Sequence, residues 1–294
     1  MQKTAEPFKK RDPELIIRGI TKVASLPTIF VKLDEAIGDP RSTNKDFAAI
    51  INEDTAMAAR LLRIGNSALY NFPSKIETVS HAITIIGTTQ LRDLVLACSV
   101  IKMFDNIPEE LVSMELFWRH SIAVGVAARI IATTRRENNV ERFFVAGLLH
   151  DIGRLIMFTE TANQMQHVVN HAQEEQLLLF KAEKELMGFD HAKLGGLLLT
   201  AWQLPDRLVD AVQYHHNPAR SKTHPIEAGI LHIADIIVNA LQLGTTGEHF
   251  VPPLNNSAWE QLDLADDVFS TIIDRLLIQY DDAVKFILSD NSND

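Results

Sequence analysis

The sequence predicts an all-α protein, and three observations lead to that prediction. Nearly every long segment repeats its apolar residues every three or four positions, as an amphipathic helix does, rather than every second position, as a strand does. Proline and glycine mostly fall between these segments, and Ser, Thr, Asn or Asp often precede them as helix caps. The 294 residues, 46% of them hydrophobic, suffice for one large domain or two modest ones.

The first half of the chain is predicted to form short helices joined by tight turns. The segment "STNKDFAAIINED" begins with capping residues and ends before "TAMAARLLRIGNSALY", while "SHAITII" stops at Gly87, just before "TTQLRDLVLACSVIKMF". The order helix, glycine, helix also occurs in DNA-binding helix-turn-helix motifs. Here the second helix offers only Arg92 as a base-reading cation, which disfavours that alternative.

The second half places polar residues on apolar helix faces. Apolar residues at steps of four and three put His120 on the apolar face of one helix. The segment "VERFFVAGLLHDIGRLIMF" is apolar nearly all round, which predicts one central buried helix that carries His150 and Asp151. In "EAGILHIADIIVNAL", Asp235 shares a face with apolar residues. We therefore expect all four polar side chains to point inward.

Two further segments bring histidines to helix ends. The helix in "DHAKLGGLLLTAW" can begin with Asp190 as its cap, directly before His191. The helix in "LPDRLVDAVQYHHNP" has Pro205 near its start and ends before Pro218, which leaves the histidine pair at 215–216 in the last turn. These histidines therefore lie close to helix ends and can turn toward a common point.

The C-terminal residues 256–294 are predicted to form two amphipathic helices with acidic outer faces. They carry nine acidic residues against two basic ones, which accounts for −7 of the formal net charge of −10. Such a tail repels phosphate backbones, so nucleic acid is not an expected partner. We expect this segment to be an appendage on the core and a candidate partner surface.

The inward-facing polar residues form a candidate metal site. Neutral imidazoles and carboxylates are ligands that divalent iron, manganese, nickel or zinc accept. Neighbouring helix residues diverge by about 100°, so Asp151 could bridge two ions, and paired ions can activate water for attack on phosphorus. The alternative is a structural remnant in which His150 and Asp151 bond only to each other and to adjacent helices. The candidate ligands for one or two ions are His120, His150, Asp151, His191, His215, His216 and Asp235.

The motifs that carry these residues resemble a known family. "FWRHS", "GLLHDIG", "FDHAKLGGLLLTAWQLP" and "YHHNP" are similar to the successive motifs of the HD superfamily of metal-dependent phosphohydrolases. "LPTIFVKLDEAIGDP", "IINEDTAMAARLLRIGNSALY" and "IETVSHAITIIGTTQLRDLVL" resemble the HDOD domain, the HD-related output domain of bacterial signalling proteins. The resemblance implies an HDOD fold, in which an N-terminal helical part packs on an HD-like helical bundle.

The sequence departs in two ways from the relatives that hydrolyse cyclic diguanylate. Arg154 stands where those enzymes have a lysine, and "HHNPARSKTHP" lacks the Gly-Tyr-Pro signature expected after the paired histidines. Arginine keeps a positive charge with a different geometry, so a phosphate contact stays possible. If the chain is a hydrolase, the resemblance implies that Asp151 bridges or orients the metal-bound hydroxide and that Arg154 contacts phosphate.

The resemblance runs from about Leu26 to Pro218. We therefore divide the chain into a flexible N-terminus (1–13), an HDOD domain (14–245, with an N-terminal helical part at 14–110 and an HD-like part at 111–245) and the acidic appendage (246–294). The resemblance implies a bacterial signal-transduction protein that acts through a protein partner or a nucleotide second messenger. The alternative is a metal-dependent phosphohydrolase acting on a nucleotide or cyclic dinucleotide. HDOD proteins are generally regarded as regulatory, so catalysis is not the first expectation, and the oligomeric state stays open.

The expected compartment is the cytoplasm. The polar start "MQKTAEPFKKRDPE" lacks the apolar core of a signal peptide, and no apolar stretch approaches the roughly 18 residues of a membrane span. With Cys98 as its single cysteine the chain cannot form an internal disulfide, which fits a reducing environment.

Overall fold

A computed structural model describes residues 10–20, 26–70, 72–104, 112–265 and 267–288, and within these residues it is helical without any strand, which confirms the all-α prediction. The predicted flexible N-terminus (1–13) lies mostly outside the described residues, as does the boundary predicted between residues 110 and 111. The helices are α1 (Pro13–Gly19), α2 (Thr28–Gly38), α3 (Asn44–Asn52), α4 (Thr55–Gly65), α5 (Val79–Ile86), α6 (Thr88–Met103), α7 (Met114–Thr134), α8 (Glu141–Leu149), α9 (Ile152–Glu160), α10 (Ala162–Glu174), α11 (Leu179–Met187), α12 (His191–Ala201), α13 (Asp206–Tyr214), the 3₁₀ helix η1 (Pro218–Arg220), α14 (Pro225–Leu241), α15 (Asn256–Leu262) and α16 (Val268–Leu288).

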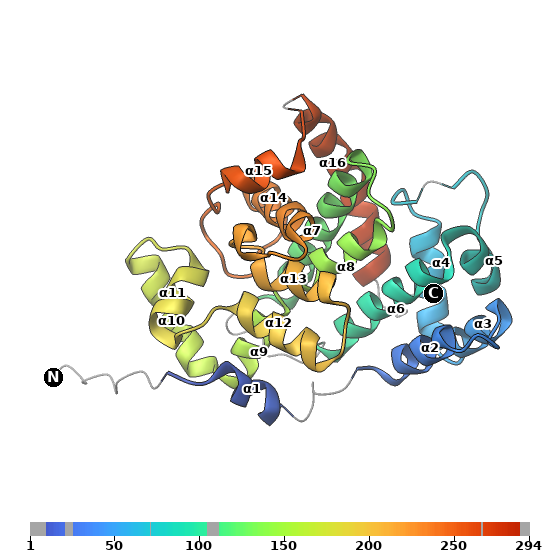
Figure 1. Ribbon diagram of the computed structural model, residues 1–294, viewed down its shortest axis with the longest axis horizontal. Coiled ribbons are helices and arrows are strands. Elements are labelled where there is room, and N and C mark those ends of the chain that lie inside the picture. The colour runs from blue at the N-terminus through green and yellow to red at the C-terminus, as the bar shows by residue number, and fades with distance from the viewer. Residues whose placement is uncertain (1–9, 21–25, 71, 105–111, 266, 289–294) are drawn as a thin grey trace.

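Helices α2 to α6 form an N-terminal helical part on one side of the molecule (Figure 1). The capping residues predicted at the start of "STNKDFAAIINED" do cap α3, where Thr43 and Asp46 form a capping box, and the structure adds Asp54 as the cap of α4. Gly87 separates α5 from α6 with φ +99°, a left-handed conformation that favours glycine. The interior of this part is apolar, with Leu61 and Leu94 fully buried.

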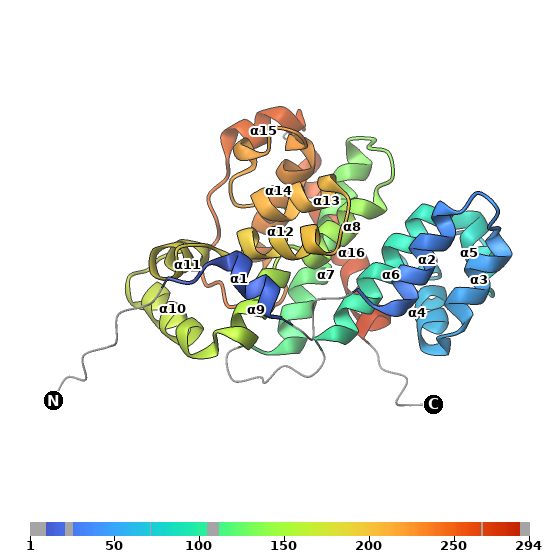
Figure 2. The same ribbon diagram turned by 60° about the horizontal axis from the view of Figure 1, so that its bottom comes forward.

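The HD-like part is built around α7, which packs against α8, α14 and α16. Glycine lets the central pair approach closely, because a Cβ atom on Gly147 of α8 would overlap the backbone of Gly125 of α7. Figure 2 shows α12, α13 and α14 stacked above α7 and α9. Side chains from α7, α12, α13 and α14 can therefore meet in the interior of the HD-like part.

The segment predicted as one central helix over residues 140–158 is broken, so that prediction is wrong in this respect. Helix α8 ends at Leu149 and α9 begins at Ile152, with Asp151 outside helical geometry at φ −99° and ψ +10°. Gly153 lets α9 come so near α12 that an added Cβ would overlap the carbonyl oxygen of His191. The two halves of the segment thus pack on different helices, α8 on α7 and α6 and α9 on α12.

The first and last helices, α1 and α16, both pack on the HD-like part, and α16 also contacts the N-terminal helical part. Helix α1 packs on α12 of the HD-like part, although it precedes the N-terminal helices in sequence (Figure 1). Helix α16 contacts both α7 and α4 and buries Ile272, Leu276 and Ile287, so the acidic C-terminal segment has an apolar face joined to the core. Among the described residues no single helix is both long and apolar enough to cross a membrane; the sharply bent pair α5 and α6 meets that requirement only when both helices are counted together.

Candidate metal centre

All seven predicted ligands converge in the interior of the HD-like part. Six of them are at most 5% exposed, and His216 is half-buried. They come from α7 (His120), the α8–α9 break (His150 and Asp151), the start of α12 (His191), the end of α13 (His215 and His216) and α14 (Asp235). Three groups have ligand atoms close enough for one ion: His120, His150 and Asp235; His150, Asp151 and His215; and His191, His215 and His216. We refer to the seven residues as the HD cluster.

Asp235 joins two histidines on one side of the HD cluster. Its Oδ1 atom lies 3.3 Å from His120 Nε2 and 3.7 Å from His150 Nε2, and it accepts a 2.7 Å hydrogen bond from the Asn239 amide. Burial would raise the pKa of the Asp235 carboxyl, but the contact with His120 and the charge of His150 lower it to about 2. Asp235 is therefore ionised and available to a cation.

Backbone carbonyls orient two of the histidines. His150 Nδ1 donates to Gly147 O at 2.7 Å, and His215 Nδ1 donates to Val212 O at 2.7 Å. A carbonyl can only accept, so each Nδ1 carries the proton and each Nε2 presents a lone pair when the ring is neutral. Burial, with the charges of His150 and His191, lowers the pKa of His215 to about 3, so its imidazole is neutral.

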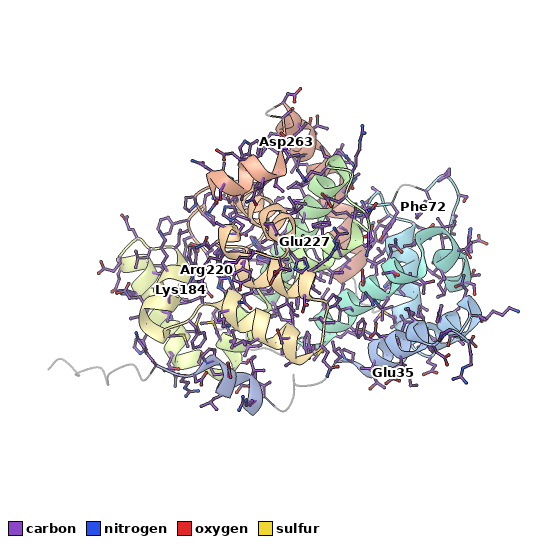
Figure 3. All side chains as sticks on the ribbon, in the orientation of Figure 1. Glu35, Phe72, Lys184, Arg220, Glu227 and Asp263 are labelled. Atoms are coloured by element: carbon purple, nitrogen blue, oxygen red, sulfur yellow. The ribbon has the colours of Figure 1, made fainter. Side chains whose placement is uncertain are left out.

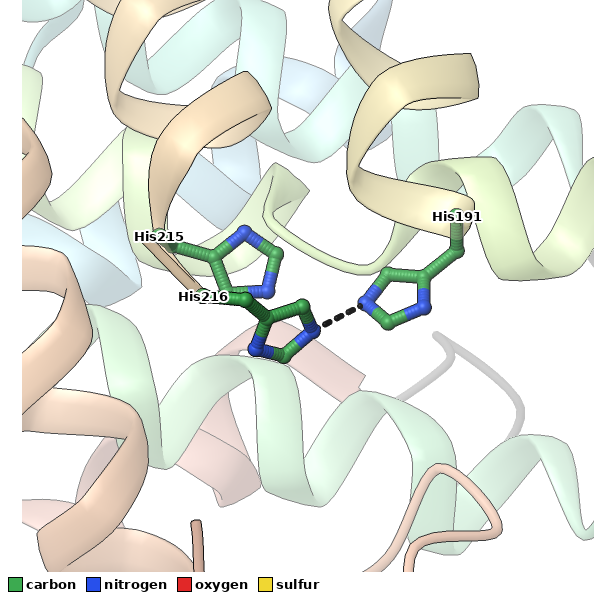
Figure 4. A group of neighbouring side chains, drawn as sticks. All are labelled: His191, His215 and His216. Atoms are coloured by element: carbon green, nitrogen blue, oxygen red, sulfur yellow. Dashed lines mark hydrogen bonds between the residues drawn. The ribbon is translucent and has the colours of Figure 1, made fainter. Parts of the chain in front are cut away.

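The third group gathers at the ends of α12 and α13 (Figure 4). His216 Nε2 lies 2.9 Å from His191 Nε2, and the rings of His215 and His216 are 3.9 Å apart between centroids. Phe180 of α11 stacks on the ring of His216 at 4.1 Å. This aromatic contact fixes the orientation of a side chain that is otherwise partly open.

Arg154 is buried inside the same region, at 2% exposure. Its guanidinium donates to Asp151 Oδ2 at 2.8 Å, to Glu183 Oε1 at 3.2 Å and to Thr246 Oγ1. It also lies 2.8 Å from His191 Nδ1. The phosphate contact predicted for Arg154 stays a prediction, and in this structure protein acceptors surround the guanidinium.

Glu183 belongs to this network and was missed in the sequence. It is fully buried, and its Oε2 atom accepts from the backbone N–H of His191 at 2.8 Å and from His191 Nδ1 at 2.7 Å. Since a carboxylate only accepts, Nδ1 carries a proton and the Arg154 guanidinium lies against the imidazole ring. The signal was available, because Glu183 shares the apolar face of α11 with Leu179 and Met187.

The two nitrogens of His191 both meet carboxylates. Nε2 lies 2.8 Å from Asp151 Oδ1, opposite the contact between Nδ1 and Glu183. Burial and Arg154 oppose the charged imidazole, but Glu183 and Asp151 outweigh them and raise the pKa of His191 to about 9. Burial would raise the pKa of Glu183, yet His191 and Arg154 lower it to about 2. In the absence of a metal, His191 is a cation between two anions.

His232 of α14 supports the HD cluster through contacts with the backbone. Its Nδ1 donates to His215 O at 2.7 Å, and its Nε2 accepts from Asn255 N at 3.0 Å. Both nitrogens are used by the backbone, so His232 positions the turn that carries the histidine pair.

The donor atoms fit a divalent ion. Two buried atoms of the second group have no hydrogen-bond partner among the described residues, His150 Nε2 and His215 Nε2, and beside them Asp151 Oδ1 contacts His191 Nε2. Nearly all buried polar atoms in proteins find a partner, so the two unpartnered imidazole nitrogens next to a carboxylate favour a bound cation over an apolar core. The HD cluster could therefore hold a metal.

Comparison with known proteins identifies the family. The HDOD domain profile matches residues 23–218, about two thirds of the chain. The chain belongs to the HDOD domain family. The match covers six members of the HD cluster, and Asp235 lies beyond it.

Solved structures share this HDOD fold. An HDOD domain protein "with unknown function" from Geobacter sulfurreducens is 23% identical, with a TM-score of 0.74 over 94% of this chain and 98% of that one. A protein from Shewanella amazonensis SB2B named "Putative metal-dependent phosphohydrolase" is 22% identical, with a TM-score of 0.65 over 94% of this chain and 99% of that one. At these identities the likeness establishes the fold alone.

One curated relative is an uncharacterized protein of Treponema pallidum (strain Nichols), 24% identical over 200 residues. The matched region is 67% of this chain but 38% of the relative, so this chain spans well under half of that protein.

Proposed function

We propose that this HDOD protein is regulatory, with a metal ion in the HD cluster that fixes the relative positions of its helices, and that it acts through a protein partner. The observation that carries the proposal is enclosure. Six of the seven cluster residues are at most 5% exposed, whereas a phosphodiester must reach both the ion and a water molecule. An enclosed ion can stabilise the fold and make it respond to metal binding, but it is poorly placed to hydrolyse a substrate.

The ligands explain how an ion would act on the fold. Candidate ligands come from α7, the α8–α9 break, the ends of α12 and α13, and α14, so one ion would connect helices that are distant in sequence. A bound divalent metal would supply positive charge to the cluster carboxylates, and its binding free energy would add to folding stability. Loss of the ion would loosen the packing of α8 on α7 and α14.

A cleft lies between the N-terminal helical part and the HD-like part, and it is the candidate site where a partner would detect this loosening of α8. It has a volume of about 750 Å³ and is lined by residues of α2, α6, α8, α13 and α14. Glu35 and Glu227, both in the lining, come from opposite parts of the molecule (Figure 3). Helix α8 supplies Phe143 and Ala146 to the cleft and ends one residue before His150.

The charges of the cleft favour a protein partner over a nucleotide. Its three arginines already contact carboxylates: Arg92 lies 3.1 Å from Asp34, Arg142 lies 3.4 Å from Glu227, and Arg207 lies 3.6 Å from the same glutamate. A phosphate entering the cleft would have to displace these pairs. A protein segment with mixed charge and an apolar side chain would complement both the pairs and the apolar lining.

Metal content and turnover on the same samples test the proposal. Purified wild type, His150→Ala and Asp151→Ala are analysed by mass spectrometry for metal and assayed on cyclic dinucleotides and bis(p-nitrophenyl) phosphate. His167→Ala, which changes an exposed histidine on α10, is the control. We expect metal in the wild type and the control, loss of metal in both cluster variants, and no turnover. Metal-dependent turnover that both cluster variants abolish would overturn the regulatory proposal.

The second candidate is a metal-dependent phosphohydrolase, and the unpartnered Nε2 atoms of His150 and His215, which group with Asp151, favour it. In that case Asp151, the one carboxylate adjacent to both the first and the third groups, orients the attacking water. Hydrolysis requires the cluster to open, because its residues are enclosed. Amide hydrogen exchange of α12 and α13 with and without metal distinguishes an opening site from a closed one.

A further inference from the structure

Resting on the metal-bearing HD cluster of the proposed function, we propose that the cluster holds a single divalent ion and that the buried guanidinium of Arg154 supplies the positive charge that a second ion would otherwise provide. The donor atoms alone would permit more than one ion, because the seven residues form three overlapping groups. The balance of buried charge and the contacts of Asp151 and His191 decide between these possibilities.

The first argument is charge. The carboxylates buried within the cluster and its contacts are Asp151, Asp235 and Glu183, and the buried cation is Arg154. With every histidine neutral these four groups sum to −2, and with a cationic His191 they sum to −1, so one divalent ion balances or exceeds either sum. A second divalent ion would leave an excess of two or three positive charges in a nearly dry interior, where uncompensated charge is strongly unfavourable.

Two neighbouring carboxylates change this sum by at most one charge. Asp190 pairs with Lys184 at 2.6 Å. Glu248 is half-buried and accepts three backbone N–H bonds, from Leu179, His249 and Phe250. The charge of Glu248 also acts on Arg154, and when it is counted a second divalent ion still leaves a positive excess.

The second argument is the use of the Asp151 carboxylate. A carboxylate that bridges two ions gives one oxygen to each. Here Oδ2 accepts the 2.8 Å charge-assisted hydrogen bond from Arg154, and Oδ1 lies 2.8 Å from His191 Nε2. Both oxygens of Asp151 therefore already face protein groups, so this carboxylate is not free to bridge two ions.

The third argument is the engagement of His191. Glu183 and Asp151 contact its two nitrogens, and Arg154 lies against its ring, with Nη2 3.2 Å from Nε2. An ion on His191 Nε2 would stand next to the guanidinium and meet its repulsion. The group that involves neither His191 nor Asp151 is His120, His150 and Asp235, which leaves one set of ligands for one ion.

The test is the number of ions bound per chain. Metal-free protein is titrated with Mn²⁺ and with Zn²⁺ by calorimetry, and Mn²⁺ spin resonance reports whether two ions lie close enough to couple. We expect one ion per chain in the wild type and in Arg154→Lys, which keeps the charge. Arg154→Met removes the charge and keeps the length, and it should bind a second ion with a coupled Mn²⁺ spectrum. Arg129→Met is the matched control, because Arg129 pairs with Glu141 at 2.8 Å away from the cluster, and it should stay at one ion.

The outcomes separate this inference from the proposed function. Two coupled ions in the wild type would overturn the inference and leave a metal-bearing regulatory protein intact. A single ion in correctly folded Arg154→Met would also overturn it. No metal in the wild type after reconstitution would remove both. Should Arg154→Met fail to fold, wild-type stoichiometry still decides, and Arg154→Lys tests that charge rather than shape limits binding.

Discussion

The two parts of this protein bury different chemistry with the same kind of secondary structure. Helices α2 to α6 enclose an apolar interior, and the ion pairs of Arg92 with Asp34 and Asp93 lie near its edge. Helices α7 to α14 enclose the HD cluster together with Arg154 and Glu183. An apolar interior tolerates small shifts of its helices, whereas a buried charge network requires each partner at a fixed distance.

Glycine positions mark the same contrast. Gly147 and Gly153, which flank the α8–α9 break, both face backbone so closely that a Cβ would overlap it. At Gly38, the last residue of α2, an added Cβ would meet no atom within 4 Å. The part that holds the HD cluster therefore depends on close contacts between helix backbones, which only glycine permits at these two positions.

The largest expected effect is the loss of a cluster carboxylate. Asp151→Asn should lower the free energy of unfolding by about 3–5 kcal/mol, because it leaves the buried Arg154 without its closest carboxylate. The matched change in the N-terminal part is Asp93→Asn, where burial raises the pKa of the carboxyl in spite of Arg92. That variant should change stability by less than about 1 kcal/mol, because Arg92 keeps Asp34.

Urea unfolding of metal-free protein measures both variants. Equal losses of unfolding free energy in Asp151→Asn and Asp93→Asn would mean that a buried carboxylate matters equally in the two parts, which would contradict the contrast between them.

The next effect is a pH dependence confined to the HD-like part. The pKa of His191 is raised to about 9 from an ordinary value near 6.5, so its stabilising contribution is complete below pH 6.5 and is lost as the pH rises through 9. Metal-free wild type should lose on the order of 3 kcal/mol of unfolding free energy between pH 6 and pH 9.5. Glu183→Gln removes the nearest anion and should flatten this slope.

Glu185→Gln is the control for that experiment, because Glu185 lies on the same helix with its side chain 58% exposed. Unfolding free energies at the two pH values give the slope for each protein. A slope in Glu183→Gln as steep as in the wild type would show that His191 does not owe its charge to Glu183.

A smaller effect should follow from closing the glycine contact. Gly153→Ala should cost about 1–3 kcal/mol or more, since the new methyl group must push α9 away from α12 and separate Asp151 from His191. Gly38→Ala, at an exposed site with open space, should instead stabilise by roughly 0.4–1 kcal/mol. Thermal unfolding and metal content of both variants test this pair. If Gly153→Ala unfolds at the wild-type temperature and keeps its metal, the HD cluster does not depend on the close contact between α9 and α12.

The smallest effect concerns reactivity in the apolar part. Burial raises the pKa of the Cys98 thiol to about 11, in spite of nearby cations. At pH 8 a thiol reagent should label the folded protein roughly 100-fold more slowly than the urea-unfolded chain, because far less thiolate is present. The rate should increase as the pH is raised toward 11. Rapid labelling of the folded protein at pH 8 would show that this core opens.

Local signals predicted much of the fold. The capping residues before "KDFAAIINED" and the glycine at position 87 predicted a helix start and a helix break that the structure confirms. The break at His150 and Asp151 was not predictable. The segment is apolar on all sides, so its sequence has no helical periodicity whose interruption would mark a break. Glu183 was missed for a related reason: one acid on an apolar face is a local anomaly until its partners are known.

By itself the sequence determined the all-α class, the HDOD motifs and the identity of seven inward-facing polar residues, because caps, periodicity and motif order are properties of neighbouring residues. Only the tertiary structure decided that these residues converge, that Glu183 and Arg154 join them, and that the site is enclosed. Distances between α7, α9, α11, α12 and α14 depend on helix crossing angles and on close contacts such as that of Gly153 with His191. No pattern along the chain specifies those angles.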